Sequence, residues 1–218
     1  MIAEPRLFVA VPIQEEARAA IAAIVETIRA GEPPGKGVRW VRLDGLHVTL
    51  RFLGPTTEDR VDAVASAVRE AAADGAPFEL RIHGAGAFPA AGRPRTLWLA
   101  IHAGGEALAA LAGALDERLE PAGWPRSDRP FRAHLTLARA DGVRVGSQTA
   151  AALRAAAAEL DLTCVADRLV LYESVTGGGR ARYVSRAEAT LGGDEAVLPS
   201  RRPRVGLREH RQGAPNTS

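Results

Sequence analysis

The chain has 218 residues, of which 46% are hydrophobic and 25% are charged, as in an ordinary globular protein with a buried core. Its formal net charge is +2, but residues 200–218 contain five arginines and one glutamate, and subtracting their +4 leaves −2 for residues 1–199. The body of the chain therefore does not indicate a broad nucleic-acid-binding surface. The single cysteine, Cys164, excludes an internal disulfide and a metal site built from several cysteines.

Hydrophobic spacing defines twelve segments along the chain, separated by loops rich in glycine and proline. In chain order they are a strand at 6–12, a helix at 14–29, strands at 38–42 and 47–52, a helix from about 57 to 73, strands at 77–88 and 95–101, a helix at 106–119, a strand at 131–138, a helix at 147–159, and strands at 162–172 and 181–191. Beyond residue 191 the periodicity is lost, and we expect residues 192–218 to form a disordered, arginine-rich tail.

The sequence contains no apolar run of the roughly 20 residues that a membrane-spanning helix needs. Its N-terminus also lacks the basic and apolar segments of a secretory signal. We therefore expect a cytoplasmic protein with no membrane partner. Leu162 and Val165 flank Cys164, which indicates a buried, unreactive thiol.

A His-x-Thr-Leu motif occurs twice, at residues 47–50 (HVTL) and 134–137 (HLTL). Each copy alternates in the manner of a half-buried strand, with the histidine and the threonine projecting from the same face. Two such strands can bring two imidazoles and two hydroxyls into one cleft. The repeated motif is therefore the strongest functional feature of the sequence.

The order of the segments and the repeat together predict the fold. Short helices interspersed with mostly hairpin-connected strands are typical of an α+β fold in which helices cover antiparallel sheets. Because the strand motif is repeated, we expect residues 1–191 to form one domain of two lobes related by approximate twofold symmetry. Both His-x-Thr strands would then face a central cleft.

The motifs and their flanks resemble the two-histidine phosphoesterase superfamily, and within it the RNA 2′,3′-cyclic phosphodiesterases, also called LigT-like proteins or 2′-5′ RNA ligases. The resemblance extends from about residue 6 to residue 191. It rests on RLFVAVP near the start, VRWVRLDGLHVTLRFLG around the first motif, GAFP and RPRTLWLA in the middle, RPFRAHLTLAR around the second motif, and LYES with GGGRARY near the end. Ala133 is a departure, since the family often has proline before the second histidine.

The resemblance implies metal-independent hydrolysis of an RNA-terminal 2′,3′-cyclic phosphate to a 2′-phosphomonoester, without a cofactor. Ring opening needs a base for the attacking water and an acid for the leaving oxygen, and imidazole suits both roles because its reference pKa is about 6.5. The resemblance makes His47 the proton donor and His134 the proton acceptor, a choice that the symmetric spacing does not make. Thr49 and Thr136 share the faces of the histidines, where hydroxyl donors can bind the phosphate.

Three arginines near the motifs are candidates for phosphate binding. By strand parity, Arg51 shares the face of His47 and Arg132 shares that of His134, and both are possible ligands. Arg139 has the opposite parity to His134, so an unbroken strand would turn it away. The resemblance nevertheless places a phosphate-contacting arginine at this position, which requires the strand to end or bulge first.

The remaining candidates favour structural roles. Phe52 is able to stack on a base, but it alternates away from His47, which favours a place in the core. His83, His102 and His210 lack a threonine partner, and we expect no role for them.

Other functions stay open from the sequence. The same cleft would also suit 2′-5′ RNA ligation, which differs only in the nucleophile, or hydrolysis of small cyclic nucleotides. A non-catalytic nucleotide- or RNA-binding module is a further alternative, although a binder needs no acid–base pair. No carboxylate cluster flanks either motif, so we expect no metal. The expected partners are RNA ends or nucleotides with a 2′,3′-cyclic phosphate; no protein partner is implied, and we expect a monomer.

Overall fold

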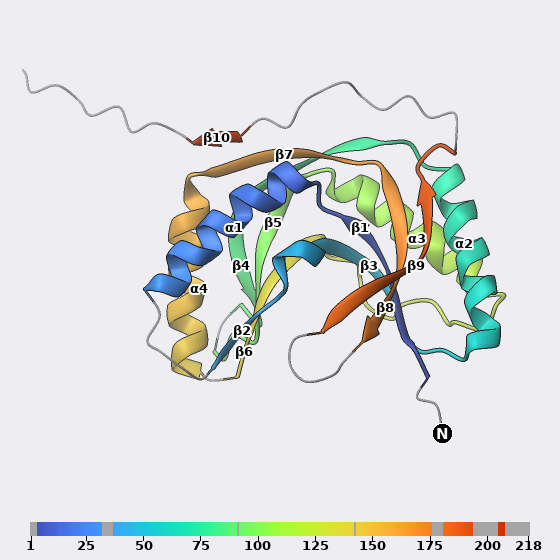
Figure 1. Ribbon diagram of the computed structural model, residues 1–218, viewed down its shortest axis with the longest axis horizontal. Helices are drawn as coiled ribbons and strands as arrows, with labels where there is room; N and C mark the ends of the chain where they lie inside the picture. Colours follow the sequence, from blue (N-terminus) through green and yellow to red (C-terminus); the bar gives the residue numbers. More distant parts are fainter. Residues whose placement is uncertain are drawn as a thin grey trace, which may run out of the picture.

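A computed structural model describes residues 4–31, 37–90, 92–141, 143–175, 181–193 and 205–207. Within these ranges the strands form two sheets (Figure 1). The four-stranded sheet has the order β3 (His47–Pro55), β1 (Arg6–Pro12), β8 (Arg168–Val175) and β9 (Arg182–Thr190). The six-stranded sheet has the order β10 (Val205–Leu207), β7 (Leu160–Ala166), β4 (Phe78–Phe88), β5 (Thr96–Ala103), β6 (His134–Ala140) and β2 (Val38–Trp40). The helices are α1 (Glu15–Ala30), α2 (Val61–Ala73), α3 (Gly105–Leu119) and α4 (Val143–Ala158), with 3₁₀ turns η1 (Leu43–Gly45) and η2 (Glu58–Arg60).

The two sheets repeat one arrangement when each is read from its histidine-bearing strand. In the first sheet β3 pairs with β1, β1 with β8 and β8 with β9, all antiparallel. In the second sheet β6 pairs with β5, β5 with β4 and β4 with β7, again antiparallel. Each histidine strand lies beside an earlier strand from which one α-helix separates it in the sequence: α1, followed by β2 and η1, lies between β1 and β3, and α3 lies between β5 and β6. The predicted α+β class with two pseudo-symmetric lobes is confirmed.

Two pairs of helices cover the sheets and tie the lobes together. Helices α1 and α4 pack together on the side of the six-stranded sheet, where they contact β7 and β4. Helices α2 and α3 pack together on the four-stranded sheet, where they contact β8, β9 and β3. In Figure 1 these pairs flank the strands on the left and on the right. Because α1 follows a strand of one sheet and packs on the other, and α3 does the reverse, neither lobe can separate without losing a helix.

The predicted starts of β6 and α4 are among the boundaries that differ from the structure. Strand β6 begins at His134 instead of residue 131, because the carbonyl of Arg132 bonds to the imidazole of His134 (2.6 Å) and Pro130 has no N–H to donate. Helix α4 begins at Val143, so Ser147 lies inside the helix and is not its cap. Gly146 resembles a break in the sequence, but it allows the helix to approach Pro94, whose carbonyl oxygen would lie 2.7 Å from a β-carbon at Gly146.

The segment at 162–172 is two strands instead of the single strand predicted. Strand β7 ends at Ala166 and pairs with β4, whereas β8 begins at Arg168 and pairs with β1 in the other sheet. The chain changes sheets at Asp167, whose carbonyl accepts a hydrogen bond from the N–H of Leu191 (2.8 Å). The alternation of buried residues continues up to Ala166, so the charge of Asp167 was the one local sign of a break.

Residues on both sides of the predicted boundary at residue 191 contact the rest of the chain. Leu191 is fully buried, and the N–H of Gly192 donates to the carbonyl of Ala72 (2.9 Å). Strand β10, which lies within the predicted tail, pairs with the edge of β7. The rest of 194–218 lies outside the described residues, so the disorder of the tail stays a prediction.

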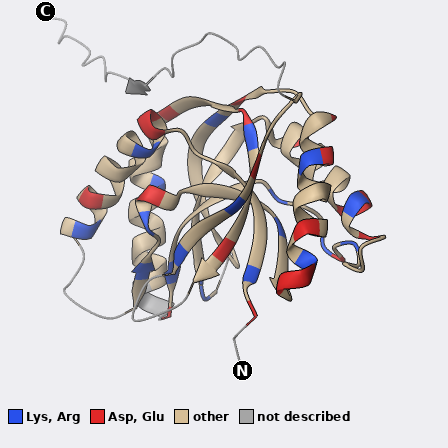
Figure 2. Cartoon of the chain, turned by 45° about the vertical axis from the view of Figure 1, so that its right-hand side comes forward, with Lys and Arg blue, Asp and Glu red and all other residues tan. Residues whose placement is uncertain are grey.

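Charged residues of both signs are spread along the helices on the two flanks (Figure 2). None of the helices in the described ranges is long and apolar enough to cross a bilayer. The mixture of positive and negative residues along these helices agrees with the composition, which predicts that any polyanion site is local.

Gly86 of β4 lies directly opposite Trp98 of β5, and a β-carbon on it would lie 2.3 Å from Cη2 of the indole. We expect Gly86→Ala to displace Trp98 and to lower the free energy of unfolding by about 1–3 kcal/mol. Gly113→Ala is the matched control, because Gly113 lies in α3 with open space around it and alanine favours helix by up to about 1 kcal/mol. Urea unfolding of both variants measures the difference. Equal stability of Gly86→Ala and the wild type would contradict this packing.

Candidate active site

His47 is the first residue of β3, and His134 is the first residue of β6. Both line a single cleft of about 1330 Å³, whose walls come from both sheets and from α3. All seven candidate residues line this cleft: His47, Thr49, Arg51, Arg132, His134, Thr136 and Arg139. The structure therefore brings the two copies of the motif together.

Both imidazoles are held by the same local hydrogen bond. Nδ1 of His47 lies 2.7 Å from the carbonyl oxygen of Gly45, and Nδ1 of His134 lies 2.6 Å from that of Arg132. A carbonyl oxygen only accepts, so Nδ1 carries the hydrogen and donates it in each case. This fixes the tautomer and leaves Nε2 of each ring as the nitrogen that can exchange a proton with a ligand in the cleft.

Aromatic side chains surround His47. Its ring lies 4.9 Å from that of Phe8 and 5.0 Å from that of Tyr183, which meets it edge-on at 87°. Burial by these neighbours lowers the pKa of His47 from its ordinary value of 6.5, and the hydrogen bond to Gly45 partly opposes this shift. The free protein therefore favours the neutral imidazole at this position more than an exposed histidine would.

His134 has a corresponding pair of aromatic neighbours. The ring of Phe88 meets it edge-on at 5.2 Å, and the indole of Trp98 lies 6.3 Å away. The sequence did not single out these aromatic neighbours of the two histidines, because they come from strands distant in the chain and aromatic residues on strands are usually part of the core. Phe88 and Trp98 belong to the GAFP and RPRTLWLA segments, which carry part of the family resemblance.

The hydroxyls of Thr49 and Thr136 also line the cleft, each two residues after its histidine. In the part of the chain that the structure describes, neither hydroxyl makes a hydrogen bond. Each is therefore available as a donor to a ligand placed between the histidines.

Arg139 reaches the cleft because β6 contains a bulge. The ladder between β5 and β6 pairs Trp98 with Thr136 and Leu97 with Ala138, so Leu137 is an extra residue. Leu137 and Ala138 are both fully buried, which restores Arg139 to the side of His134. The charge of Arg139 also lowers the pKa of Tyr183 against the larger opposing effect of burial, so these two side chains are close in space.

Arg51 differs from Arg139 because it is already engaged within the protein. Its Nε lies 2.9 Å from a carboxylate oxygen of Asp116, with only 15% and 17% of the two side chains exposed. Its guanidinium also donates to the carbonyl of Pro125. Arg132 lines the cleft beside His134, and none of the described residues forms an ion pair with it.

The prediction that Phe52 belongs to the core is wrong. The β1–β3 ladder pairs Val9 with Arg51 and Ala10 with Thr49, so Leu50 is an extra residue that breaks the alternation. Phe52 is 66% exposed, lines the cleft, and lies 5.8 Å from the ring of Phe8 on the His47 side of the sheet. An exposed phenylalanine on the wall of a cleft is a candidate for ligand contact.

The other candidates lie away from the cleft. Nδ1 of His83 lies 2.7 Å from the carbonyl of Leu160, and His102 packs against its ring. His210 is outside the described residues. Cys164 is buried, which raises the pKa of its thiol to about 11 and makes it unreactive. Among the residues with described positions, no three His, Cys, Asp or Glu side chains gather as metal ligands would.

Comparison with known proteins adds to this geometry. Residues 15–178 match the profile of the 2′-5′ RNA ligase superfamily. The RNA 2′,3′-cyclic phosphodiesterase of Archaeoglobus fulgidus is 35% identical over 134 residues, which make up 62% of this chain and 72% of that protein. A crystal structure of a Thermus thermophilus protein matches with a TM-score of 0.66 and 27% identity, covering 87% of this chain and 100% of that one. E. coli LigT complexed with 3′-AMP matches with a TM-score of 0.64 and 27% identity, covering 86% and 99%.

Proposed function

Because the chain belongs to the 2′-5′ RNA ligase superfamily, we propose that it is an enzyme that hydrolyses the 2′,3′-cyclic phosphate at the end of an RNA strand to a 2′-phosphomonoester. The observation that carries this proposal is the pair of histidines in one cleft, each holding its Nδ1 hydrogen on a carbonyl and leaving Nε2 free. A site that only binds nucleotides would not need two imidazoles fixed in the same tautomer.

The proposed reaction is an in-line displacement at phosphorus. Nε2 of His134 accepts a proton from water as the water oxygen forms its bond to phosphorus. The bond from phosphorus to the 3′ oxygen breaks, and His47 donates the proton on its Nε2 to that oxygen. The phosphate stays on the 2′ oxygen, and solvent returns both imidazoles to their starting states. No metal takes part in this scheme.

The proposed ligands of the reacting phosphate are the two threonines and Arg139. Negative charge grows on the non-bridging oxygens as water attacks, and the unpaired hydroxyls of Thr49 and Thr136 are placed to donate to them. Arg139 supplies a positive charge on the same side of the cleft. Arg51 is not included, because Asp116 already neutralises it.

The nucleoside of the substrate is proposed to contact Phe52. Among the described residues, Phe52 is the most exposed large hydrophobic side chain, and it lies on the cleft wall near His47. A base gains from stacking on such a ring without regard to its identity. E. coli LigT, which shares the fold, is complexed with the nucleotide 3′-AMP.

The test is incubation with a 2′,3′-cyclic nucleotide in the presence of EDTA, with the product identified by ³¹P NMR. We expect a 2′-phosphomonoester and no loss of rate on chelation. A product joined to a second nucleotide through a 2′-5′ bond would show ligation in its place. No turnover of either kind, from a folded protein, would overturn the proposal.

The buried position of His47 predicts a particular pH dependence. As the acid, His47 must carry its proton, and burial lowers the pKa of this group in the free enzyme. We therefore expect kcat/KM to fall as the pH rises through a value below about 6.5. The bound phosphate is anionic and stabilises the imidazolium, so kcat alone should fall at a higher pH than kcat/KM. Rate profiles over pH give both values, and descending limbs that coincide above neutrality would contradict this role.

A further inference from the structure

The cleft carries more positive charge than the reacting phosphate requires. Among the described residues that line it there are five arginines and one carboxylate, that of Asp116. Arg51 neutralises Asp116 at 2.9 Å. The other four arginines make no ion pair and no side-chain hydrogen bond within the described part of the chain: Arg6, Arg129, Arg132 and Arg139. Arg139 is the arginine proposed to bind the reacting phosphate. The other three have no anionic partner among the described residues or in the proposed reaction.

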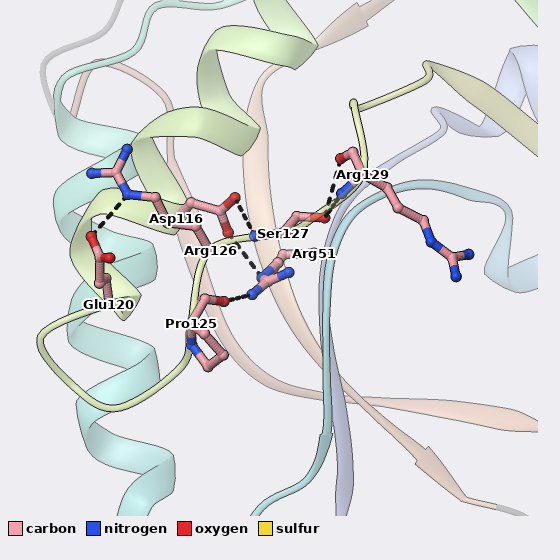
Figure 3. A network of polar contacts seen from close by, with 7 residues as sticks. All are labelled: Arg51, Asp116, Glu120, Pro125, Arg126, Ser127 and Arg129. Atoms are coloured by element: carbon pink, nitrogen blue, oxygen red, sulfur yellow. Dashed lines mark hydrogen bonds and ion pairs between the residues drawn. The ribbon is translucent and has the colours of Figure 1, made fainter.

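A network of polar contacts fixes the loop that carries Arg129 (Figure 3). The carboxylate of Asp116 in α3 accepts a hydrogen bond from the N–H of Ser127 (3.2 Å), and it is also paired with Arg51 of β3. Arg51 in turn donates to the carbonyl of Pro125. Helix, strand and loop are therefore joined at one partly buried ion pair.

Ser127 extends this network to the backbone of Arg129. Its hydroxyl donates to the carbonyl of Arg129 (3.2 Å) and accepts a hydrogen bond from the N–H of the same residue (3.4 Å). In Figure 3 the side chain of Arg129 extends away from these contacts, with its guanidinium free. The loop is thus held in place while the charge that it carries stays unpaired, as a preorganised anion ligand requires.

The size of the cleft agrees with a ligand longer than one nucleotide. Sites for single small molecules measure about 300–1,000 Å³. The cleft here is about 1330 Å³. A terminal nucleotide at the histidines would leave room for part of the strand that leads to it.

We propose that Arg129 binds a backbone phosphate of the RNA strand upstream of the cyclic end, so that the enzyme distinguishes an RNA terminus from a free cyclic nucleotide. This inference rests on the proposed function, whose substrate class it specifies. Arg129 would act by positioning the strand and would not touch the reacting phosphorus. The fixed loop makes its contribution to binding larger than that of an arginine on a free surface.

The experiment compares Arg129→Gln with the wild type on a five-nucleotide RNA ending in a 2′,3′-cyclic phosphate and on the corresponding cyclic mononucleotide. We expect kcat/KM for the RNA to fall about tenfold more than kcat/KM for the mononucleotide, the effect of losing one charged hydrogen bond. The slope of log(kcat/KM) for the RNA against log[salt] should become shallower by about 0.7. Arg69→Gln is the matched control, since Arg69 lies on α2 outside the cleft, bonded to Ser66 (3.0 Å).

Two further measurements keep the outcome decisive. Ser127→Ala retains the charge of Arg129 but frees its backbone, and we expect an intermediate loss confined to the RNA. Fluorescence anisotropy with the same RNA carrying a terminal phosphomonoester reports binding without turnover. If the wild type shows no hydrolase activity but Arg129→Gln still binds this RNA more weakly, the proposed function fails. The contact between Arg129 and a backbone phosphate would nevertheless be supported. Equal effects on RNA and mononucleotide, or the same loss in Arg69→Gln, would overturn the inference.

Discussion

Replacing either His47 or His134 with alanine is expected to lower the turnover of a 2′,3′-cyclic phosphate by about 10²–10⁴-fold, the usual contribution of general acid or base catalysis. Both rings present Nε2 to the same cleft, and the leaving alkoxide is poor enough to need its proton. His102→Ala is the matched control, because His102 lies outside the cleft beside His83. Its activity should equal that of the wild type. Steady-state rates on a cyclic mononucleotide measure all three variants.

An activated substrate separates the two roles. A diester with a nitrophenolate leaving group needs no acid, so His47→Ala should recover much of its rate on it, whereas His134→Ala should not. Recovery by His134→Ala in place of His47→Ala would mean that the roles are reversed. Reversed roles would have a physical basis, because burial lowers the pKa of His47 and so favours its neutral form, which is the form that accepts a proton. If neither variant recovers, the histidines act as electrostatic clamps and the acid–base scheme fails.

The positions of the motif residues in the cleft could be predicted from the sequence, because the face to which a strand residue points depends only on its place in the alternation. His47 and Thr49 project from one face through the period of the strand alone, as do His134 and Thr136, and the repeat implied that the two faces meet. The fold class followed in the same way from the order of segments. The alternation in the sequence does not show where a strand contains a β-bulge, which changes the face of every residue after it.

Two bulges account for the largest differences between sequence and structure at the site. The extra Leu137 turns Arg139 into the cleft, an event that the resemblance required but that spacing alone argued against. The extra Leu50 turns Phe52 onto the cleft wall, where parity had placed it in the core. Bulges depend on the neighbouring strand, and nothing in the residues themselves marks them. Arg51 is a related case, because its partner Asp116 lies 65 positions further along the chain.

Removing the hydroxyl of Thr49 or Thr136 is expected to raise the barrier of the reaction by up to about 2–4 kcal/mol, the range found for single oxyanion donors. Valine keeps the shape and the strand preference of threonine. Neither hydroxyl has a hydrogen-bond partner in the described part of the free protein, so Thr49→Val and Thr136→Val break no native bond. The free energy of unfolding should therefore stay close to that of the wild type.

This combination of lost rate and retained stability distinguishes a transition-state ligand from a structural threonine. Urea unfolding and kcat on a 2′,3′-cyclic nucleotide, measured on the same preparations, test it. Thr49→Ser and Thr136→Ser are the matched controls, since serine keeps the donor and loses only a methyl group, and they should retain most of the rate. Wild-type turnover in the valine variants would remove the threonines from the phosphate site. Arg139 would then be left as the charged ligand proposed beside the histidines.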